Sequence, residues 1–169
     1  MSGPLADPAA PRHLSIVDVY VLLYRDDGKI LLLERAHTGY ADGQLCPASG
    51  HLEAGEDVVS GAVREAAEEV GVRINPADLE FAHVVHHRNG DGQGRIGFFF
   101  TARHWTGEPF NREPHKCAGL FWVDPAAPPV HTVPYTAAAL AQIARGQVFS
   151  LDGWTTPETT ATAPSGGRG

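Results

Sequence analysis

The 169-residue sequence predicts a single α/β domain, because strand-like segments stand on both sides of one central helical segment and a second helical segment follows. With 43% apolar and 20% charged residues, the chain can bury one sizeable hydrophobic core. Both ends are poor in apolar residues, which predicts flexible tails at 1–13 and 155–169 around a folded domain at 14–154.

The first predicted strand runs from Ser15 to Tyr24, where Val17, Val19, Val21 and Leu23 would share one face. Asp26-Asp27-Gly28 predicts a turn, and Lys29–Glu34 is then the returning strand of a hairpin. Cys117–Asp124 predicts a further strand near the end of the domain.

A second hairpin is predicted from strands Phe81–Arg88 and Arg95–Trp105 around the glycine-rich segment 89–94. Nothing helical follows these glycines, so we interpret them as turn residues rather than as a phosphate-binding loop. Phe98, Phe99 and Phe100 in the second strand are interpreted as core residues.

Two helices are predicted. The first covers Asp57–Val70, with Asp57 as N-cap and Gly71 ending the last turn. Its apolar side would consist of Val59, Ala62, Val63, Ala66 and Val70. The second runs from Tyr135 to Arg145 and ends at Gly146, with an apolar face of Ala137, Leu140, Ala141 and Ala144.

Three carboxylates, Glu65, Glu68 and Glu69, fall on one stripe of the first helix. Such a cluster alone is also compatible with a solvated face, because the repulsion of like charges on an exposed helix is small. The glycine-bearing loop Ser49–Glu56 in front of the helix adds main-chain carbonyls and another carboxylate. Mg²⁺ prefers such oxygen ligands, which favours a metal site here.

The segment from Gly50 to Val72 resembles the Nudix box. Gly50 is followed after five residues by Glu56 and, after seven more, by Arg64-Glu65-Ala66-Ala67-Glu68-Glu69-Val70-Gly71-Val72, so that every defining position is filled. Nine fixed positions at set spacings make a chance match very improbable. On these residues the chain is identified as a member of the Nudix family.

This resemblance implies an α/β/α sandwich, with a mixed sheet between helices, and a divalent metal site for Mg²⁺ or Mn²⁺. The implied metal ligands are the side chains of Glu65, Glu68 and Glu69 and the main-chain carbonyl of Ser49. Arg64 corresponds to the arginine that orients the glutamates, whereas Gly50, Glu56 and Gly71 have structural or supporting roles. A local ion pair is an equal alternative for Glu56.

The segment from Trp105 to Glu113 resembles a loop of MutT-type Nudix enzymes in which a glutamate reaches the metal site. Glu113 is therefore a further candidate metal ligand, with a plain loop carboxylate as the alternative. In the implied reaction water attacks phosphorus, and either Glu65 or Glu113 takes its proton.

Candidate substrate-binding residues lie outside the box. Arg35 and Arg88 could each meet a phosphate in two-point contact. His131 follows a proline-rich stretch where MutT-type enzymes place a purine-reading asparagine, so specificity for oxidised guanine triphosphate is in doubt. His115 is a weaker candidate for a substrate contact.

Two further details of the sequence concern a possible histidine metal site and the path of the loop before the box. His86 and His87 would point to opposite faces of their strand, so they cannot share a metal ion. In Pro47-Ala48-Ser49-Gly50 the proline stands one residue farther from the box than usual, which predicts a slightly different path of the metal loop.

Composition excludes several other classes of protein. A net charge of -7 argues against a nucleic-acid-binding surface, and no apolar stretch is long enough to span a membrane. Cys46 and Cys117 have no spacing typical of a zinc or redox site. The sequence thus predicts a soluble, cytoplasmic protein with two reduced thiols.

The expected function is Mg²⁺-dependent hydrolysis of a diphosphate linkage in a nucleoside di- or triphosphate or a related nucleoside diphosphate, by a chain that could form a homodimer. The main alternative is a regulatory module on the same fold that binds a nucleotide such as ADP-ribose with little catalysis. A diphosphate isomerase is a third hypothesis, which is supported only by the position of Cys46 near the site in the sequence.

Overall fold

The computed structural model describes residues 12–154, so the tails predicted at 1–13 and 155–169 lie almost wholly outside the described residues. The two helices are α1 (Val58–Val70) and α2 (Pro134–Ala144), and a short 3-10 turn lies at Pro76–Asp78. The strands are β1 (Ile16–Leu23), β2 (Ile30–Arg35), β3 (Leu45–Cys46), β4 (Ala48–His51), β5 (Leu79–Arg88), β6 (Gly94–Ala102), β7 (Cys117–Val123) and β8 (Phe149–Asp152).

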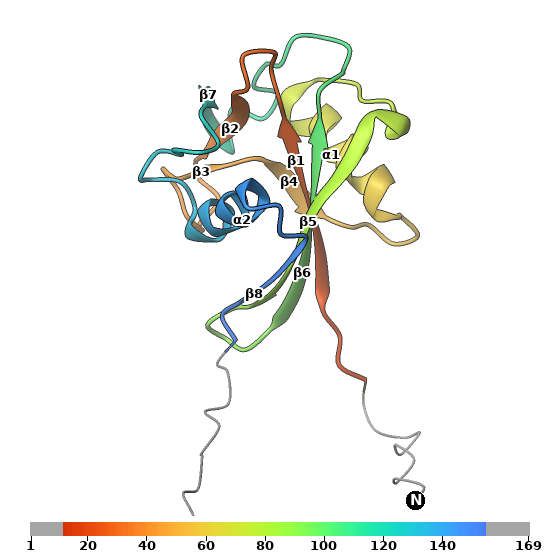
Figure 1. Cartoon of the computed structure of the whole chain (residues 1–169), viewed down its shortest axis with the longest axis vertical. Coiled ribbons are helices and arrows are strands. Elements are labelled where there is room, and N and C mark those ends of the chain that lie inside the picture. The colour runs from red at the N-terminus through yellow and green to blue at the C-terminus, as the bar shows by residue number, and fades with distance from the viewer. Residues whose placement is uncertain (1–11, 155–169) are drawn as a thin grey trace, which may run out of the picture.

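The strands form two sheets. The larger has the order β4-β1-β6-β5-β8 and is mixed, because β1 runs parallel to β6 and β5 parallel to β8 while the other neighbours are antiparallel. The smaller is antiparallel, with the order β3-β2-β7. Figure 1 shows α1 and α2 on opposite sides of the larger sheet, so the predicted α/β/α sandwich with a mixed sheet is confirmed.

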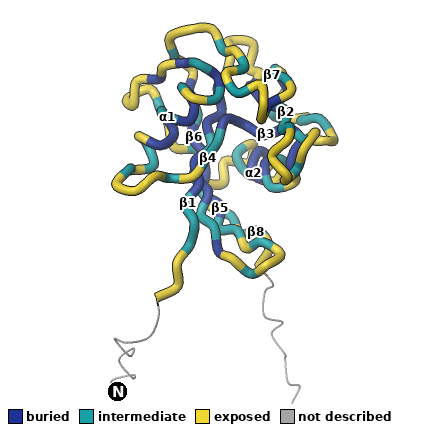
Figure 2. Tube along the Cα trace, turned by 180° about the vertical axis from the view of Figure 1, so that it is seen from behind, coloured by how far each residue is buried: buried dark blue, intermediate teal, exposed yellow. Residues whose placement is uncertain are grey.

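The core has two halves, one on each side of β1. Val19, Val21 and Leu23 pack in the cluster that includes α1, as the alternation predicts, whereas Leu22 packs in the cluster that includes Ala139 and Leu140 of α2. β1 is therefore buried on both faces, and Figure 2 shows buried chain along the middle of the domain. Within residues 12–154 no helix is long and apolar enough to cross a membrane.

Helix α1 begins and ends as its sequence predicts. The Asp57 carboxylate accepts hydrogen bonds from the main-chain N–H groups of Val59 and Ser60. At the other end Gly71 adopts a left-handed conformation with φ of 73° and donates its N–H to the carbonyl of Ala67. The aromatic ring of Phe110 lies against the Cα of Gly71, where any side chain would collide with it.

The hairpin of β5 and β6 is confirmed, and so are the turn at 26–28 and the strand that follows it, but the expected pairing of that strand with β1 is wrong. Around the turn at 26–28 the chain makes one isolated bridge between Tyr24 and Ile30 and a hydrogen bond from the N–H of Arg25 to the carbonyl of Lys29. Beyond these, β2 pairs with β3 and β7 instead of β1. A strand has two edges, and β4 and β6 occupy both edges of β1. β2 must therefore leave for a second sheet.

Two other features differ from the sequence prediction. The buried face of α2 carries Thr136, Ala139 and Leu140, whereas Ala141 and Ala144 are exposed, because the many alanines of this helix do not mark one face. The short strands β3 and β4 and the edge strand β8 were not predicted. β8 extends the larger sheet beyond β5 and closes the domain after α2.

We predict that Gly71→Ala destabilises the protein more than Gly146→Ala. Both glycines have φ near 70°, so alanine strains the backbone at either position by roughly 1 kcal/mol. Only at Gly71 would the new Cβ also meet the ring of Phe110, whereas nothing lies within 4 Å at Gly146. Urea denaturation should give a larger loss for Gly71→Ala, and equal losses would contradict the described packing of Phe110.

Candidate active site

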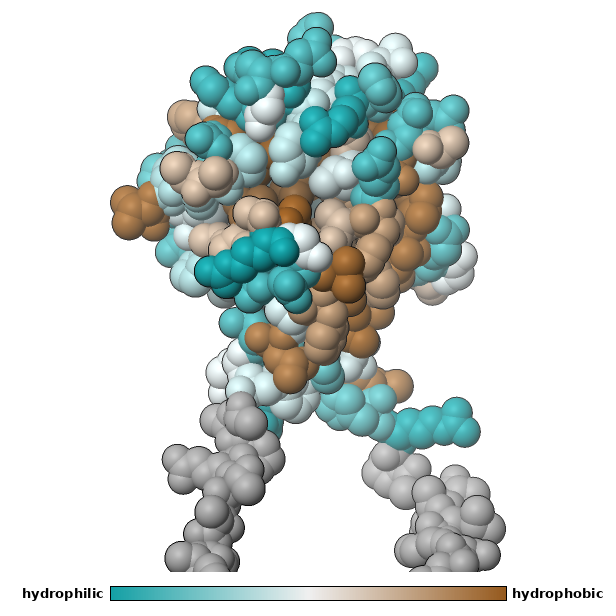
Figure 3. Space-filling view, in the orientation of Figure 1, coloured by the Kyte–Doolittle hydropathy of each residue, from teal (hydrophilic) through white to brown (hydrophobic). Residues whose placement is uncertain are grey.

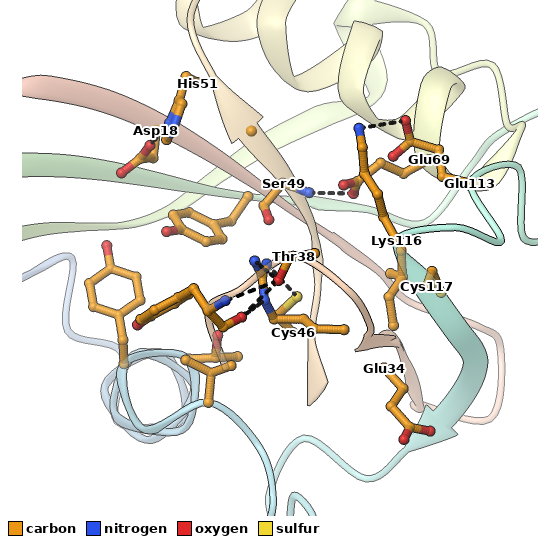
Figure 4. Close-up of a pocket in the computed structure, with 18 of the residues that line it drawn as sticks. Asp18, Glu34, Thr38, Cys46, Ser49, His51, Glu69, Glu113, Lys116 and Cys117 are labelled. Atoms are coloured by element: carbon orange, nitrogen blue, oxygen red, sulfur yellow. Dashed lines mark hydrogen bonds and ion pairs between the residues drawn. The ribbon is translucent and has the colours of Figure 1, made fainter. Parts of the chain in front are cut away.

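A cavity of about 530 Å³ opens between the larger sheet, the N-terminal end of α2 and the loop before β7. Figure 4 shows that Glu69 and Glu113 lie together at one end of it, with Asp18 and His51 at another. Several elements distant in sequence contribute polar side chains, namely Asp18, Tyr20, Arg35, Ser49, His51, Glu69, His87, Arg95, Glu113, Lys116 and Tyr135.

Helix α1 and strand β4 meet at the carboxylate end of the cavity. The main-chain N–H of Ser49 donates to Oε2 of Glu69 at 2.8 Å. The carboxylate of Glu65 lies against the Cα of Gly50, because a Cβ there would be 1.9 Å from Oε1 of Glu65. Glycine is therefore the residue that lets this helix approach β4 so closely.

Arg64 holds the surrounding carboxylates in place. Its Nε and Nη2 donate to both oxygens of Glu56 at 2.8 and 2.9 Å, which explains the position of that glutamate in the box. Nη1 donates to Glu65 at 2.7 Å and to Glu68 at 3.3 Å, and Nη2 also donates to the carbonyl of His51 at 3.0 Å. These five contacts match the five N–H donors of the guanidinium.

The loop before β7 docks on the C-terminal end of α1 and brings Glu113 into the site. The main-chain N–H groups of Phe110 and Arg112 donate to the carbonyls of Val70 and Glu69, which have no partner within the helix. Arg112 also donates through its side chain to the carbonyl of Ala67. Glu113 then accepts from Nζ of Lys116 at 3.0 Å beside Glu69.

Burial is the main cause that raises the pKa of Glu69 and of Glu65. Burial, with the charges of Glu65 and Glu113 nearby, raises the pKa of Glu69 to about 8, although the N–H of Ser49 acts in the opposite direction. Burial also raises the pKa of Glu65, against the effect of Arg64. The hydrogen bonds from Arg64 lower the pKa of Glu56, so that this acid remains a paired anion.

The donor chemistry of this corner suits a hard divalent cation. Ser49, Glu69, Glu65 and Glu113 offer oxygen ligands, and burial, with the neighbouring carboxylates as a smaller cause, makes the charged forms of Glu65 and Glu69 costly, a cost that a bound cation would relieve. Within residues 12–154, however, no three acidic, histidine or cysteine side chains are already arranged around a common metal position. Glu65 and Glu68 instead face Arg64, and Glu68 is exposed by 53%.

The predicted substrate-binding residues differ in their position relative to the cavity. Arg35 lines the cavity and is held by the carbonyl of Tyr40 and the hydroxyl of Thr38. Arg88 lies outside it, over the ring of Trp154. The exposed side chains of His131 and His115 do not line it either, and His131 meets β3 only through its carbonyl.

His86 and His87 point to opposite faces of β5, as predicted. His87 lines the cavity, and its Nδ1 lies 2.6 Å from the carboxylate of Asp152 in β8. His86 instead packs against Trp154, with tilted rings whose centroids are 4.5 Å apart. The two imidazoles therefore cannot share a metal ion.

An ion-pair cluster that was not predicted forms one wall of the cavity. Asp18 is only 3% exposed and accepts two hydrogen bonds from Arg95, at 2.8 and 2.9 Å, and contacts Nδ1 of His51. A lone acid in the apolar strand 16–23 was a usable signal for Asp18. No such signal could pair it with Arg95, which is 77 residues away in sequence.

Aromatic rings line the cavity beside this ion-pair cluster, also without a sequence prediction. Tyr20 stacks on the buried Phe99 with centroids 4.4 Å apart and meets Tyr135 of α2 at 5.5 Å. The hydroxyl of Tyr135 lies over Gly97, which has no side chain to block it. Cys46 also lines the cavity, but burial raises its pKa to about 11, so it remains a thiol near neutral pH.

Known proteins with the same architecture provide an independent comparison. The MutT NUDIX hydrolase from Burkholderia pseudomallei superposes with a TM-score of 0.69 at 26% identity, covering 77% of this chain and 98% of that protein. The ORF135 protein of E. coli matches with a TM-score of 0.65 at 24% identity, covering 85% and 94%. The MutT protein of Methanosarcina mazei Go1 matches with 0.65 at 18%, covering 80% and 97%.

The E. coli and Methanosarcina proteins are less than 25% identical to this chain, so their similarity shows the fold alone. No curated protein matches the chain by sequence. The family model for the NUDIX domain, in contrast, matches residues 14–143, which include the box, the cavity walls from β1 to β7 and most of α2. The chain belongs to the Nudix family.

Proposed function

We propose that the protein hydrolyses a diphosphate linkage in a nucleotide-like substrate with the help of Mg²⁺. The observation that carries this proposal is the meeting of Glu69 and Glu113 with the main chain of Ser49 at one end of a cavity that also contains Arg35 and Lys116. Oxygen ligands thus lie beside cationic side chains. A metal-bound diphosphate needs both kinds of group.

The residues that would hold the cation are Glu69, Glu65, Glu113 and the carbonyl of Ser49, with Glu68 close behind on the same helix. A bound divalent ion neutralises phosphate oxygens and lowers the pKa of a coordinated water. Arg64 keeps Glu65 beside Gly50 and anchors the metal loop through the carbonyl of His51. Its role is positioning, because it is fully engaged by protein groups.

The remaining side chains of the cavity bind either the phosphates or the nucleoside of the substrate. Arg35 and Lys116 can donate hydrogen bonds to phosphate oxygens from two sides of the cavity. Glu65 or Glu113 takes the proton of the attacking water, as both lie next to Glu69. The aromatic wall of Tyr20 and Tyr135 suits a flat heteroaromatic group, which favours a nucleoside over an isoprenoid.

Two comparisons support the reaction class. The family model spans the whole box, and the Burkholderia protein, at 26% identity over 77% of this chain, is described as a MutT NUDIX hydrolase. A regulatory module that only binds a nucleotide is the alternative from another class. All box glutamates and the guanidinium that orients them are present here, which favours catalysis.

We predict Mg²⁺-dependent release of phosphate or a nucleoside monophosphate from at least one member of a panel of nucleoside triphosphates, nucleotide sugars, ADP-ribose and dinucleoside polyphosphates. Glu69→Gln should lower kcat by roughly 10²–10⁴-fold, because it removes a charge that holds the metal. Glu80→Gln, an exposed acid on β5, is the matched control and should retain activity.

Chelation by EDTA should abolish the activity, and added Mg²⁺ or Mn²⁺ should restore it. The hydrolase proposal fails if no compound of the panel is cleaved faster by the parent than by Glu69→Gln. Nucleotide binding without turnover in the same assay would support the regulatory module.

A second prediction concerns metal-free protein. Burial raises the pKa of Glu69 from 4.5 to about 8, so between these values the folded state holds a proton that the unfolded state has lost. In EDTA the free energy of unfolding should therefore fall as pH rises from about 4.5 to 8. Glu69→Gln should flatten this dependence and stabilise the metal-free protein at pH 8 by up to about 4 kcal/mol.

Urea titrations of parent, Glu69→Gln and Glu80→Gln at several pH values measure this effect. Mg²⁺ should stabilise the parent and have much less effect on Glu69→Gln. If Glu69→Gln were less stable than the parent in EDTA at pH 8, burial of the Glu69 carboxylate would not destabilise the metal-free protein.

A further inference from the structure

Strand β8 (Phe149–Asp152) is the last strand of the larger sheet, and among residues 12–154 no strand pairs with its outer edge. The N–H of Val84 in β5 donates to the carbonyl of Val148, and Val84 stands opposite Phe149. In a parallel ladder of this register, alternate residues turn their polar groups to the neighbour. The N–H and C=O groups of Phe149 and Leu151 therefore point away from β5.

The side chains around this edge are apolar and exposed. Relative exposure is 61% for Val148, 54% for Phe149, 59% for Leu151, 51% for Phe81 and 36% for Trp154. Open edges in natural proteins usually carry a lysine, a proline or a bulge, whereas β8 reads Phe-Ser-Leu-Asp. Figure 3 shows hydrophobic surface over the lower part of the domain, reaching the region of β8.

The edge is held firmly enough to serve as a template. His83 is fully buried, and its two ring nitrogens contact the carbonyl of Gln147 and the hydroxyl of Ser150 at 2.7 and 2.8 Å. Asp152 is held by His87. On one face of β8 the side chains of Ser150 and Asp152 are thus fixed to β5, whereas on the other face Phe149 and Leu151 remain exposed.

We propose that β8 is a dimerisation edge, which pairs antiparallel with β8 of a second copy of this chain in a register centred on Ser150. In that register Phe149 of one copy stands opposite Leu151 of the partner subunit. The outward N–H and C=O groups of each then meet their complements, and the apolar side chains of both copies share one face. The two larger sheets become one continuous sheet.

Area and charge both favour a second copy as the occupant. The five exposed apolar residues offer on the order of 500 Å² per copy, so a symmetric pair buries at most about 1,000 Å², the lower limit for a specific interface. Phe149 and Leu151, whose main-chain groups point away from β5, carry no charge. A two-fold axis through Ser150 therefore brings no like charges together at these positions. Residues 155–169 contain no large apolar side chain that could cover the patch instead.

Sedimentation velocity of the full chain over a range of concentrations tests the dimer. The parent should reach twice the 18.0 kDa chain mass at tens of micromolar, and Leu151→Lys should raise Kd at least about tenfold. Val130→Lys replaces another exposed apolar residue, far from β8 in sequence, and should dimerise like the parent. A parent that stays monomeric, or a dimer that Leu151→Lys leaves intact, would overturn the proposal.

The register has its own test. Facing residues of a hydrogen-bonded antiparallel pair have Cα atoms about 5.5 Å apart, within the range that a disulfide spans. Under mild oxidation a mixture of Phe149→Cys and Leu151→Cys should form disulfide-linked dimers faster than either variant alone. Equal rates in the mixture and in the separate variants would contradict the register, and unchanged circular dichroism would show that each variant is folded.

Discussion

The guanidinium of Arg64 is the contact on which the site depends. It joins three parts of the chain that would otherwise be independent: the loop acid Glu56, the helix acids Glu65 and Glu68, and the carbonyl of His51 at the end of β4. Since all five donors are used in a fixed planar geometry, a lysine could not replace it. The close approach of α1 to β4, made possible by Gly50, places these contacts beneath the cavity.

This arrangement concentrates negative charge at one end of the cavity. Arg64 is engaged by Glu56 and Glu65, and Lys116 by Glu113, which leaves Glu69 with a main-chain N–H and a pKa of about 8. Such a group is costly in the metal-free state and stabilised by a cation. The same excess charge that destabilises the metal-free protein at high pH thus provides the driving force for binding metal, which links stability to the proposed activity.

Local patterns in the sequence predicted α1, its two caps and the β5–β6 hairpin, because these features depend on residues a few positions apart. The predicted pairing of β2 with β1 was wrong, because pairing depends on which strands compete for the edges of β1. The box resemblance identified the carboxylates. The walls formed by Asp18 with Arg95 and by Tyr20 with Tyr135 join residues 77 and 115 positions apart, and only the folded chain brings them together.

We propose that Glu69, Glu65, Glu113 and the carbonyl of Ser49 bind one or more divalent cations. A crystal structure of the protein with Mn²⁺, with anomalous scattering measured for manganese, tests it most directly. We expect a manganese peak at the carboxylate end of the cavity, coordinated by Glu69 and the carbonyl of Ser49, with Glu65 turned from Arg64 towards the ion. An empty cavity at saturating Mn²⁺, or a peak bound only by other residues, would contradict it.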